Sequence, residues 1–177
     1  MTIVLTAIRN GDEQTLFEWI NNRALVVNSS SFAPVHWSSH RDWLERVTKD
    51  PTMRIFAIRD ANNDQLIGTC QLHSINPLTR SAELQIRIGP TEARGKGVGT
   101  DAVSALVRFG YDDLNLHRIY LYVFAKNEAA RRCYDRVGFR EEGVLRDAGF
   151  INGGYCDVVM MSLLQPEWAP PLTTRSC

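Results

Sequence analysis

The sequence predicts an α/β protein built on one mixed β-sheet with helices on both faces. Two kinds of segment alternate along it. Short stretches carry apolar side chains at every second position, which is typical of strands, and longer stretches carry them at spacings of three and four, which is typical of helices. No internal repeat, linker or low-complexity tract separates these segments. We therefore expect one domain over residues 1–165, followed by a Pro-containing tail at 166–177.

Four helices are predicted from apolar stripes that occupy one helical face. The second helix has a candidate N-cap in Ser38 or Ser39, whose hydroxyl could accept a hydrogen bond from the first turn. The helices are expected at 12–23, 38–47, 100–111 and 128–137. The stripes of the first three consist of Leu16, Trp19 and Ile20, of Trp43, Leu44 and Val47, and of Val103, Leu106, Val107 and Tyr111.

Seven strands are predicted from alternation and from the turn formers between them. The strand at 118–125 is the clearest, because Ile119, Leu121 and Val123 fall on one side of it. The run Asp-Ala-Asn-Asn-Asp at 60–64 predicts a hairpin turn. The expected order is β-α-α-β-β-β-α-β-α-β-β, with strands at 2–7, 53–59, 65–74, 81–88, 118–125, 139–145 and 155–164.

Composition argues against several classes of partner. The chain of 177 residues has 20 Lys+Arg and 20 Asp+Glu, so it lacks the basic excess that nucleic acids and anionic membranes usually require. No apolar run reaches the roughly 20 residues that a membrane-spanning helix needs. The N-terminal segment has no basic leader. We therefore expect a cytoplasmic protein that binds neither nucleic acid nor a membrane.

The cysteines predict neither a disulfide framework nor a metal site. Cys70, Cys133, Cys156 and Cys177 form no CxxC pair, and no histidine cluster has metal-ligand spacing. Free thiols in a reducing compartment are the simplest interpretation, and no metal is expected.

A glycine-rich loop is the clearest local signal. Residues 94–100, Arg-Gly-Lys-Gly-Val-Gly-Thr, lie between a predicted strand and a predicted helix. Glycines allow tight turns, and a helix N-terminus offers unpaired N–H donors and a partial positive charge, so the segment suits an anion such as a phosphate. A simple helix cap is the alternative. The segment lacks the Gly-Lys-Ser/Thr ending of a Walker loop and the spacing of a Rossmann fingerprint.

A second motif follows directly after the strand at 118–125. Asn127, Ala130, Tyr134 and Gly138 are separated by three, four and four residues, which places them along one face of a helix. Taken alone, the motif also fits a half-buried tyrosine on a short helix that ends at a glycine cap.

Together, and about 30 residues apart, the two motifs resemble those of the GNAT superfamily of N-acetyltransferases. That family's loop pattern, Arg/Gln-x-x-Gly-x-Gly/Ala, is met by Arg94, Gly97 and Gly99, and its Asn-Ala-Tyr-Gly-Phe block is met in full. The resemblance covers roughly residues 3–164. It implies the GNAT acyl-CoA N-acyltransferase fold, acetyl-CoA as cosubstrate, and transfer of an acetyl group to a primary amine by direct attack on the thioester.

The resemblance also implies a role for each motif residue. Backbone amides of 95–100 would bind the coenzyme A pyrophosphate, and main-chain groups of 86–88, on a strand that splays from 119–124, would pair with the pantetheine arm. Asn127 would contact that arm or orient the site. The residues expected at the coenzyme are Ile86, Arg87, Ile88, Arg94, Gly95, Lys96, Gly97, Val98, Gly99, Thr100, Asn127 and Ala130.

Two catalytic residues follow from this placement. Tyr134 would protonate the leaving thiolate, since a phenol with an ordinary pKa of about 10 is a suitable acid for it, and an N–H near Ile88 would stabilise the oxyanion. Glu83 is the candidate base for the attacking amine; the alternative is a surface carboxylate paired with Arg80 or Arg87. His73 and His117 are weaker candidates for the base.

The acceptor remains open among three interpretations. The segment 18–47 is similar to the N-terminal region of bacterial enzymes that acetylate 4-amino sugars on nucleotide carriers, and this is our first expectation. Segments of 82–155 are also similar to spermidine acetyltransferases, although the first two helices supply only five carboxylates for a polycation. A protein N-terminal acetyltransferase of the ribosomal-protein type is the third. The expected acceptor-binding residues are Arg23, Phe32, His36, Trp37 and Tyr155.

Two further expectations complete the set. A GNAT-like module that binds coenzyme A without chemistry is the alternative from a different class. A homodimer is expected, with the last strands at the contact, because dimers are common in the family that the chain resembles.

Overall fold

A computed structural model describes residues 1–27 and 29–169. Its centre is a seven-stranded sheet in the order β1-β2-β3-β4-β5-β7-β6. Every neighbouring pair is antiparallel except β4 and β5, which run parallel, so the sheet is mixed, as predicted. The strands are β1 (Ile3–Thr6), β2 (Arg54–Asp60), β3 (Leu66–Asn76), β4 (Ser81–Ile88), β5 (Arg118–Phe124), β6 (Arg140–Ile151) and β7 (Gly154–Leu164).

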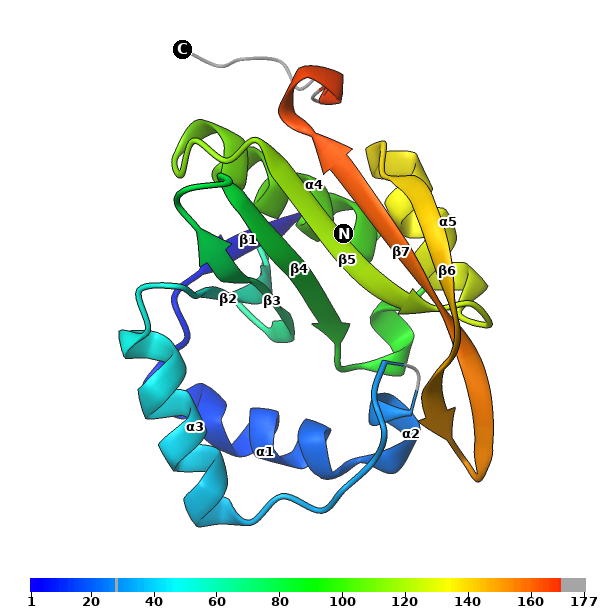
Figure 1. Ribbon diagram of the computed structural model, residues 1–177. Coiled ribbons are helices and arrows are strands. Elements are labelled where there is room, and N and C mark those ends of the chain that lie inside the picture. Colours follow the sequence, from blue (N-terminus) through cyan, green and yellow to red (C-terminus); the bar gives the residue numbers. More distant parts are fainter. Residues whose placement is uncertain (28, 170–177) are drawn as a thin grey trace.

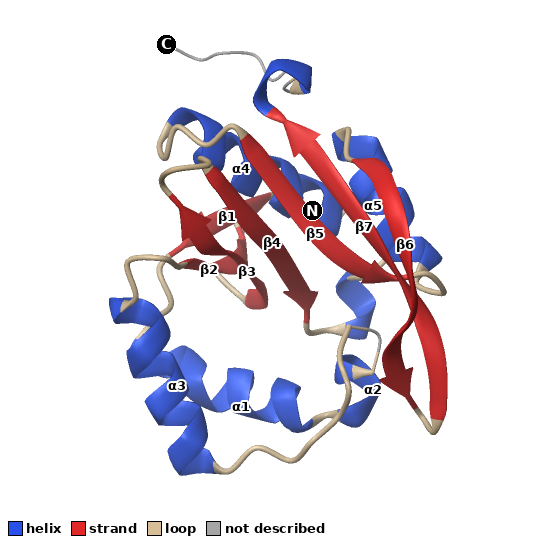
Figure 2. Ribbon diagram, in the orientation of Figure 1, coloured by secondary structure: helices blue, strands red, loops and turns tan. Residues whose placement is uncertain are grey.

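The helices form two groups on different sides of this sheet (Figure 1). Helices α4 and α5 lie behind it, and α1, α2 and α3 gather beyond the C-terminal end of β4 (Figure 2). The helices are α1 (Glu13–Asn21), α2 (Arg23–Val26), α3 (Trp37–Lys49), α4 (Val98–Asp112) and α5 (Glu128–Val137). The fold class that the sequence predicts is confirmed.

The main core lies between the sheet and α4. The predicted stripe of α4 is buried, with Val103, Leu106 and Val107 each at 0% exposure, and it packs on the apolar faces of the central strands. Gly110 allows this close approach, because a Cβ there would lie 2.8 Å from the Ile119 side chain. Tyr111 completes the stripe, and its hydroxyl donates a hydrogen bond to the Leu163 carbonyl at 2.7 Å.

The first helical region differs from its prediction. The chain turns at Asn22, where ψ is 103°, so the helix expected at 12–23 ends at Asn21, and a short helix that was not predicted, α2, follows it. The Asn22 side chain then caps α2 by accepting a hydrogen bond from the Ala24 N–H. The serine cap predicted for α3 is wrong as well, because that helix begins at Trp37 and His36 occupies its N-cap position.

The C-terminal part of the chain shows two further differences from the prediction. Strand β6 is longer than predicted, because irregular pairing between Leu145 and Gly149 interrupts the alternation on which the prediction relied. The tail is only partly peripheral: Trp168 packs against Tyr111 with ring centroids 6.2 Å apart. Residues 170–177, with Cys177, lie outside the described residues, and within the described ranges no helix is long and apolar enough to cross a membrane.

Candidate active site

The central feature of the site is the separation of β4 from β5. Their pairing covers only three positions and ends where Glu83 lies opposite Tyr120, although both strands continue. Figure 2 shows the two strands diverging towards their C-terminal ends. Beyond Glu83, the backbone groups of β4 that face β5 therefore lack a strand partner. An extended ligand can pair with such groups as an additional strand would.

Tyr134 reaches this region from α5. Its ring packs against Phe139 at 5.9 Å, and only 7% of the residue is exposed. The side chain lines a cavity next to the separated strands, and its hydroxyl makes no hydrogen bond to any residue that the structure describes. Burial raises the pKa of Tyr134 well above its usual value, so the phenol keeps its proton at neutral pH.

The other motif residues on α5 hold this helix in place. The Asn127 side chain accepts a hydrogen bond from the Ala130 N–H at 3.2 Å and so caps the N-terminus. Gly138, with φ of 108°, ends the helix in the left-handed conformation that glycine adopts without strain. The spacing that resembled the family motif is therefore the spacing of two caps around a buried tyrosine.

The glycine-rich loop forms an open turn at the start of α4. Gly95 and Gly97 have φ of 74° and 83°, and a Cβ at either would meet no atom within 4 Å, so the turn has space around it. No side chain caps the helix N-terminus, which leaves its first N–H groups available to an anion. Arg94 donates to the Ile88 carbonyl at 3.2 Å and ties the loop to the end of β4.

A cavity of about 390 Å³ lies between the sheet and the α1–α3 layer. Trp19 forms part of its wall and lies so close to Gly89 that a Cβ on that glycine would be 2.1 Å from the indole ring. The contact seats α1 against the end of β4. The apolar lining residues are Leu16, Trp19, Ile20, Val35, Trp43, Leu84 and Ile86.

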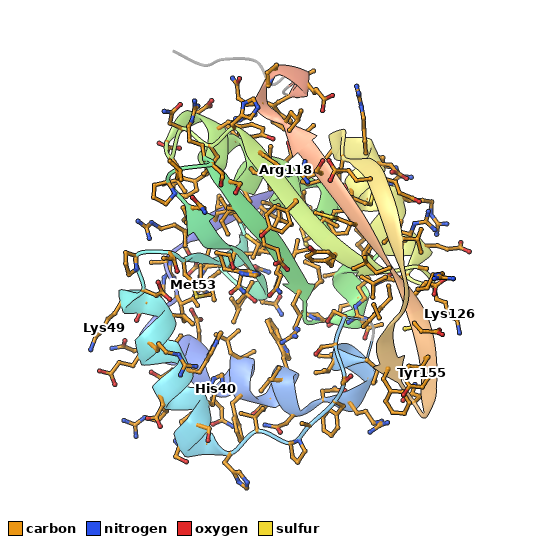
Figure 3. The ribbon with its side chains drawn as sticks, viewed as in Figure 1. His40, Lys49, Met53, Arg118, Lys126 and Tyr155 are labelled. Carbon is orange, nitrogen blue, oxygen red and sulfur yellow. The ribbon has the colours of Figure 1, made fainter. Side chains whose placement is uncertain are left out.

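The polar lining of this cavity carries no acidic side chain. Hydroxyl and amide groups from Thr69, Gln71 and Gln85 line the sheet side, and the two glutamines are hydrogen-bonded to each other at 2.9 Å. The ionisable groups in the lining are Arg87, His40, the Cys70 thiol and the two phenols Tyr122 and Tyr134. Figure 3 places His40 in the α1–α3 layer, and burial is the largest influence lowering the pKa of its imidazole.

Glu83, the predicted base, has a different neighbour from those expected. Its carboxylate lies 3.5 Å from Nε2 of His73, and each of these side chains is 18% exposed. The alternative interpretation, pairing with Arg80 or Arg87, is wrong, because Arg80 binds the Asn115 side chain and Arg87 forms no ion pair with any residue in the described ranges. Glu83 borders the point where β4 and β5 separate, but it does not line the cavity. Its role as base stays a prediction. His117 directly precedes β5, is exposed, and does not line the cavity.

The residues predicted to bind the acceptor lie outside the cavity lining. Arg23 donates to the Asn152 side chain at 2.9 Å, and its guanidinium stacks over the Phe32 ring at 5.5 Å. Tyr155 is 69% exposed near the far end of the β6–β7 hairpin (Figure 3). His36 and Trp37 lie on an exposed side of α3.

Of the predicted site residues, Ile86, Arg87 and Tyr134 line the cavity, but sequence reasoning missed several of its other side chains. Trp43, expected in the core, lines the cavity instead, as does Trp19. Gln85 could have been found, because strand alternation places it on the same face of β4 as Glu83. Within the described ranges, no group of three His, Cys, Asp or Glu side chains could hold a metal ion.

Comparisons with known proteins agree with this geometry. The sequence profile of the acetyltransferase (GNAT) domain matches residues 2–140. The spermidine N(1)-acetyltransferase of Vibrio cholerae serotype O1 is 36% identical over 169 residues, which cover 94% of this chain and 95% of that protein. The [ribosomal protein uS5]-alanine N-acetyltransferase of Escherichia coli is 25% identical over 146 residues, covering 82% of this chain and 75% of that protein.

A solved structure shows the same relationship in three dimensions. The spermidine N-acetyltransferase from Vibrio cholerae in complex with CoA and spermine superposes with a TM-score of 0.88 at 34% identity, covering 93% of this chain and 96% of the other. The chain belongs to the GNAT acetyltransferases. It is an acyltransferase with acetyl-CoA as its cosubstrate, and the non-catalytic alternative is set aside.

Proposed function

We propose that this chain acetylates the primary amine of a small molecule that binds between the sheet and the α1–α3 layer. One observation carries the proposal: β4 and β5 separate beside a cavity that contains a buried tyrosine whose hydroxyl is unpaired. The open β4 backbone fits the amide-bearing arm of coenzyme A, and the loop at 95–100 fits its diphosphate. Bound acetyl-CoA supplies an activated thioester.

The residues around the opening then have complementary tasks. The unpaired β4 backbone orients the thioester, and the N–H donors at the start of α4 hold the negative charge of the coenzyme. Tyr134 holds a proton within a buried environment and gives it to the departing sulfur. The indole rings of Trp19 and Trp43 help to exclude water from the acceptor side.

Two observations bear on the class of acceptor, and they point to different amines: the names of the relatives and the residues that line the cavity. The names of the relatives favour a polyamine over the nucleotide-linked amino sugar that the segment 18–47 suggested. A polyamine is a flexible polycation, and carboxylates are the side chains that bind such a ligand strongly. The described cavity supplies none, and its mixture of indole rings, hydroxyls and amides keeps an amino sugar as the second candidate.

A panel of amines tests the proposal directly. Purified protein with acetyl-CoA is offered spermidine, spermine, several amino sugars and their phosphates, and a peptide with an N-terminal alanine, and release of free thiol is recorded. We expect at least one acceptor to raise the rate of thiol release well above hydrolysis. If acetyl-CoA raises the melting temperature but no amine accelerates thiol release, the proposed transfer to a small-molecule amine is wrong.

A further inference from the structure

Arg87 is a cation without a counterion in the wall of the acceptor cavity. It lies on β4 directly opposite Thr69 of β3, and its side chain lines the cavity together with Gln85 and Gln71. Its Nε is fully buried and has no hydrogen-bond partner, and the guanidinium forms no ion pair with a described residue. Burial lowers the pKa of Arg87, yet a guanidinium remains charged at neutral pH.

The surroundings of Arg87 show that the chain itself does not neutralise this charge. Among the described residues, the cavity lining contains no Asp or Glu, and the Glu83 carboxylate, which lies outside this lining, is 3.5 Å from Nε2 of His73. The Gln71 and Gln85 amides are bonded to each other. The Nε–H of Arg87 has lost water without gaining an acceptor, which is unfavourable unless a ligand supplies one.

A second unpartnered group lines the same cavity. Nε2 of His40 is buried without a hydrogen bond, and that residue is only 3% exposed. The other lining residues supply indole rings, aliphatic side chains, and neutral hydroxyl and amide groups. The cavity thus offers aromatic faces, polar groups that suit hydroxyls, and one fixed positive charge.

We propose that Arg87 selects acceptor amines that also carry an anionic group, a phosphate or a carboxylate, and that it disfavours polyamines. The inference rests on the proposed function and specifies its acceptor. The planar guanidinium can donate two parallel hydrogen bonds to such a group and place the amine, on the same molecule, towards the separated strands. A polycation would meet a like charge with no carboxylate to compensate it.

Acceptors that are matched except for their charge test the proposed preference, with binding measured separately from turnover. Glucosamine 1-phosphate and glucosamine 6-phosphate differ from glucosamine only in the anionic group, and spermidine represents the polycation. Binding is followed through tryptophan fluorescence, because Trp19 and Trp43 line the cavity, and turnover is followed through thiol release. Charge-assisted hydrogen bonds of this kind correspond to a preference of roughly 10- to 100-fold for at least one phosphorylated sugar.

Variants assign the preference to one side chain. Arg87→Met should abolish the difference between the phosphorylated and plain sugars while leaving the Km for acetyl-CoA unchanged. Arg87→Lys should retain part of the preference because it keeps the charge but lacks the planar fork. Arg108→Met, which removes an exposed arginine from α4, is the control and should leave the preference intact.

Three results would overturn the inference: equal binding of the three sugars to the wild-type protein, a preference that survives Arg87→Met in a folded variant, or an Arg87→Met variant whose main defect is in acetyl-CoA binding. Preferential binding of a sugar phosphate without any thiol release would uphold the anion site. The same result would contradict the proposed function, because no acetyl group would be transferred to an acceptor that binds.

Discussion

The two sides of the active site are built in different ways. The proposed coenzyme side comes from one continuous stretch, residues 81–138, and its features belong largely to the backbone: an unpaired strand edge, an open glycine turn and a helix N-terminus. The acceptor side draws single side chains from α1, α3, β3 and β4. Backbone features require particular residue types at fixed spacing, whereas an assembled side-chain surface leaves no such local pattern.

Replacing the proposed acid should have the largest effect and should fall on the coenzyme side alone. Tyr134→Phe removes the hydroxyl but keeps the ring packing against Phe139. We expect kcat to fall by about 100-fold or more, with the Km for acetyl-CoA nearly unchanged, because a general acid contributes typically 10²–10⁴-fold. Steady-state thiol release provides the measurement.

A second buried tyrosine serves as the matched control for that change. The Tyr111 hydroxyl is bonded to the Leu163 carbonyl, far from any proposed chemistry. Tyr111→Phe should cost about 1 kcal/mol of unfolding free energy and leave kcat intact. Equal kcat values for the Tyr134→Phe variant and the wild type would remove the acid from the mechanism.

The next largest effect concerns an ion pair that joins the α1–α3 layer to the sheet. Arg59 of β2 and Asp12 at the start of α1 form an ion pair at 2.6 Å whose side chains are only 6% and 8% exposed. Asp12→Asn leaves a buried guanidinium without its counterion, so the unfolding free energy should fall by about 3 kcal/mol. Urea denaturation measures this loss of unfolding free energy.

The exposed ion pair between Arg9 and Asp64 provides the control, and Asp64→Asn should change the unfolding free energy by under about 1 kcal/mol. Similar losses in both variants would show that burial of the Asp12 pair is unimportant.

A smaller, selective effect is expected from the glycine turn. Gly97→Ala forces a side chain into the left-handed conformation at φ of 83°, which costs roughly 1–2 kcal/mol. If the turn relaxes to avoid this strain, the Km for acetyl-CoA should rise about 10-fold while the Km for the acceptor stays constant. Gly11→Ala is the control, because its Cβ would also enter open space but without a positive φ. A rise in acceptor Km alone would contradict the division of the site into two sides.

The smallest effect is expected from Glu142, which lies outside both sides of the active site, and this effect on stability depends on pH. Hydrogen bonds from Arg118 and Ser162 lower the pKa of Glu142 to about 2. A carboxyl group with a depressed folded-state pKa stabilises the protein above its ordinary pKa, and that contribution is lost as the pH falls from about 4.5 towards 2. Because the pair is partly exposed, Glu142→Gln should cost under about 1 kcal/mol at pH 7.

Urea denaturation of the wild type and the Glu142→Gln variant at pH 7 and pH 3 checks this sign. The difference in unfolding free energy should narrow at the lower pH. A difference that widens on acidification would mean that the carboxylate is not stabilised in the folded state. Neither Km should change, because Glu142 touches neither side of the site.

Much of the fold was predictable because its elements carry their own signals. The stripe of α4, the alternation of β5 and the caps of α5 depend on residues close in sequence, and these elements form nearly where they were expected. The break between α1 and α2 was not predictable in this way. It depends on Asn22 adopting an extended conformation that no neighbouring residue signals, and the irregular pairing of β6 hid its length.

The amino-acid sequence alone determined the local structure of the proposed coenzyme side, because glycines with positive φ, a capping asparagine and a tyrosine at helical spacing depend on local backbone geometry. Only the tertiary structure decided which side chains meet across the acceptor cavity. Arg87 lines this cavity with its buried Nε unpaired among the described residues, while Arg23, Phe32 and Tyr155, though suitable in type, lie outside the lining. The physical reason is that burial and the pairing of charges depend on segments distant in sequence, whose approach is set by packing.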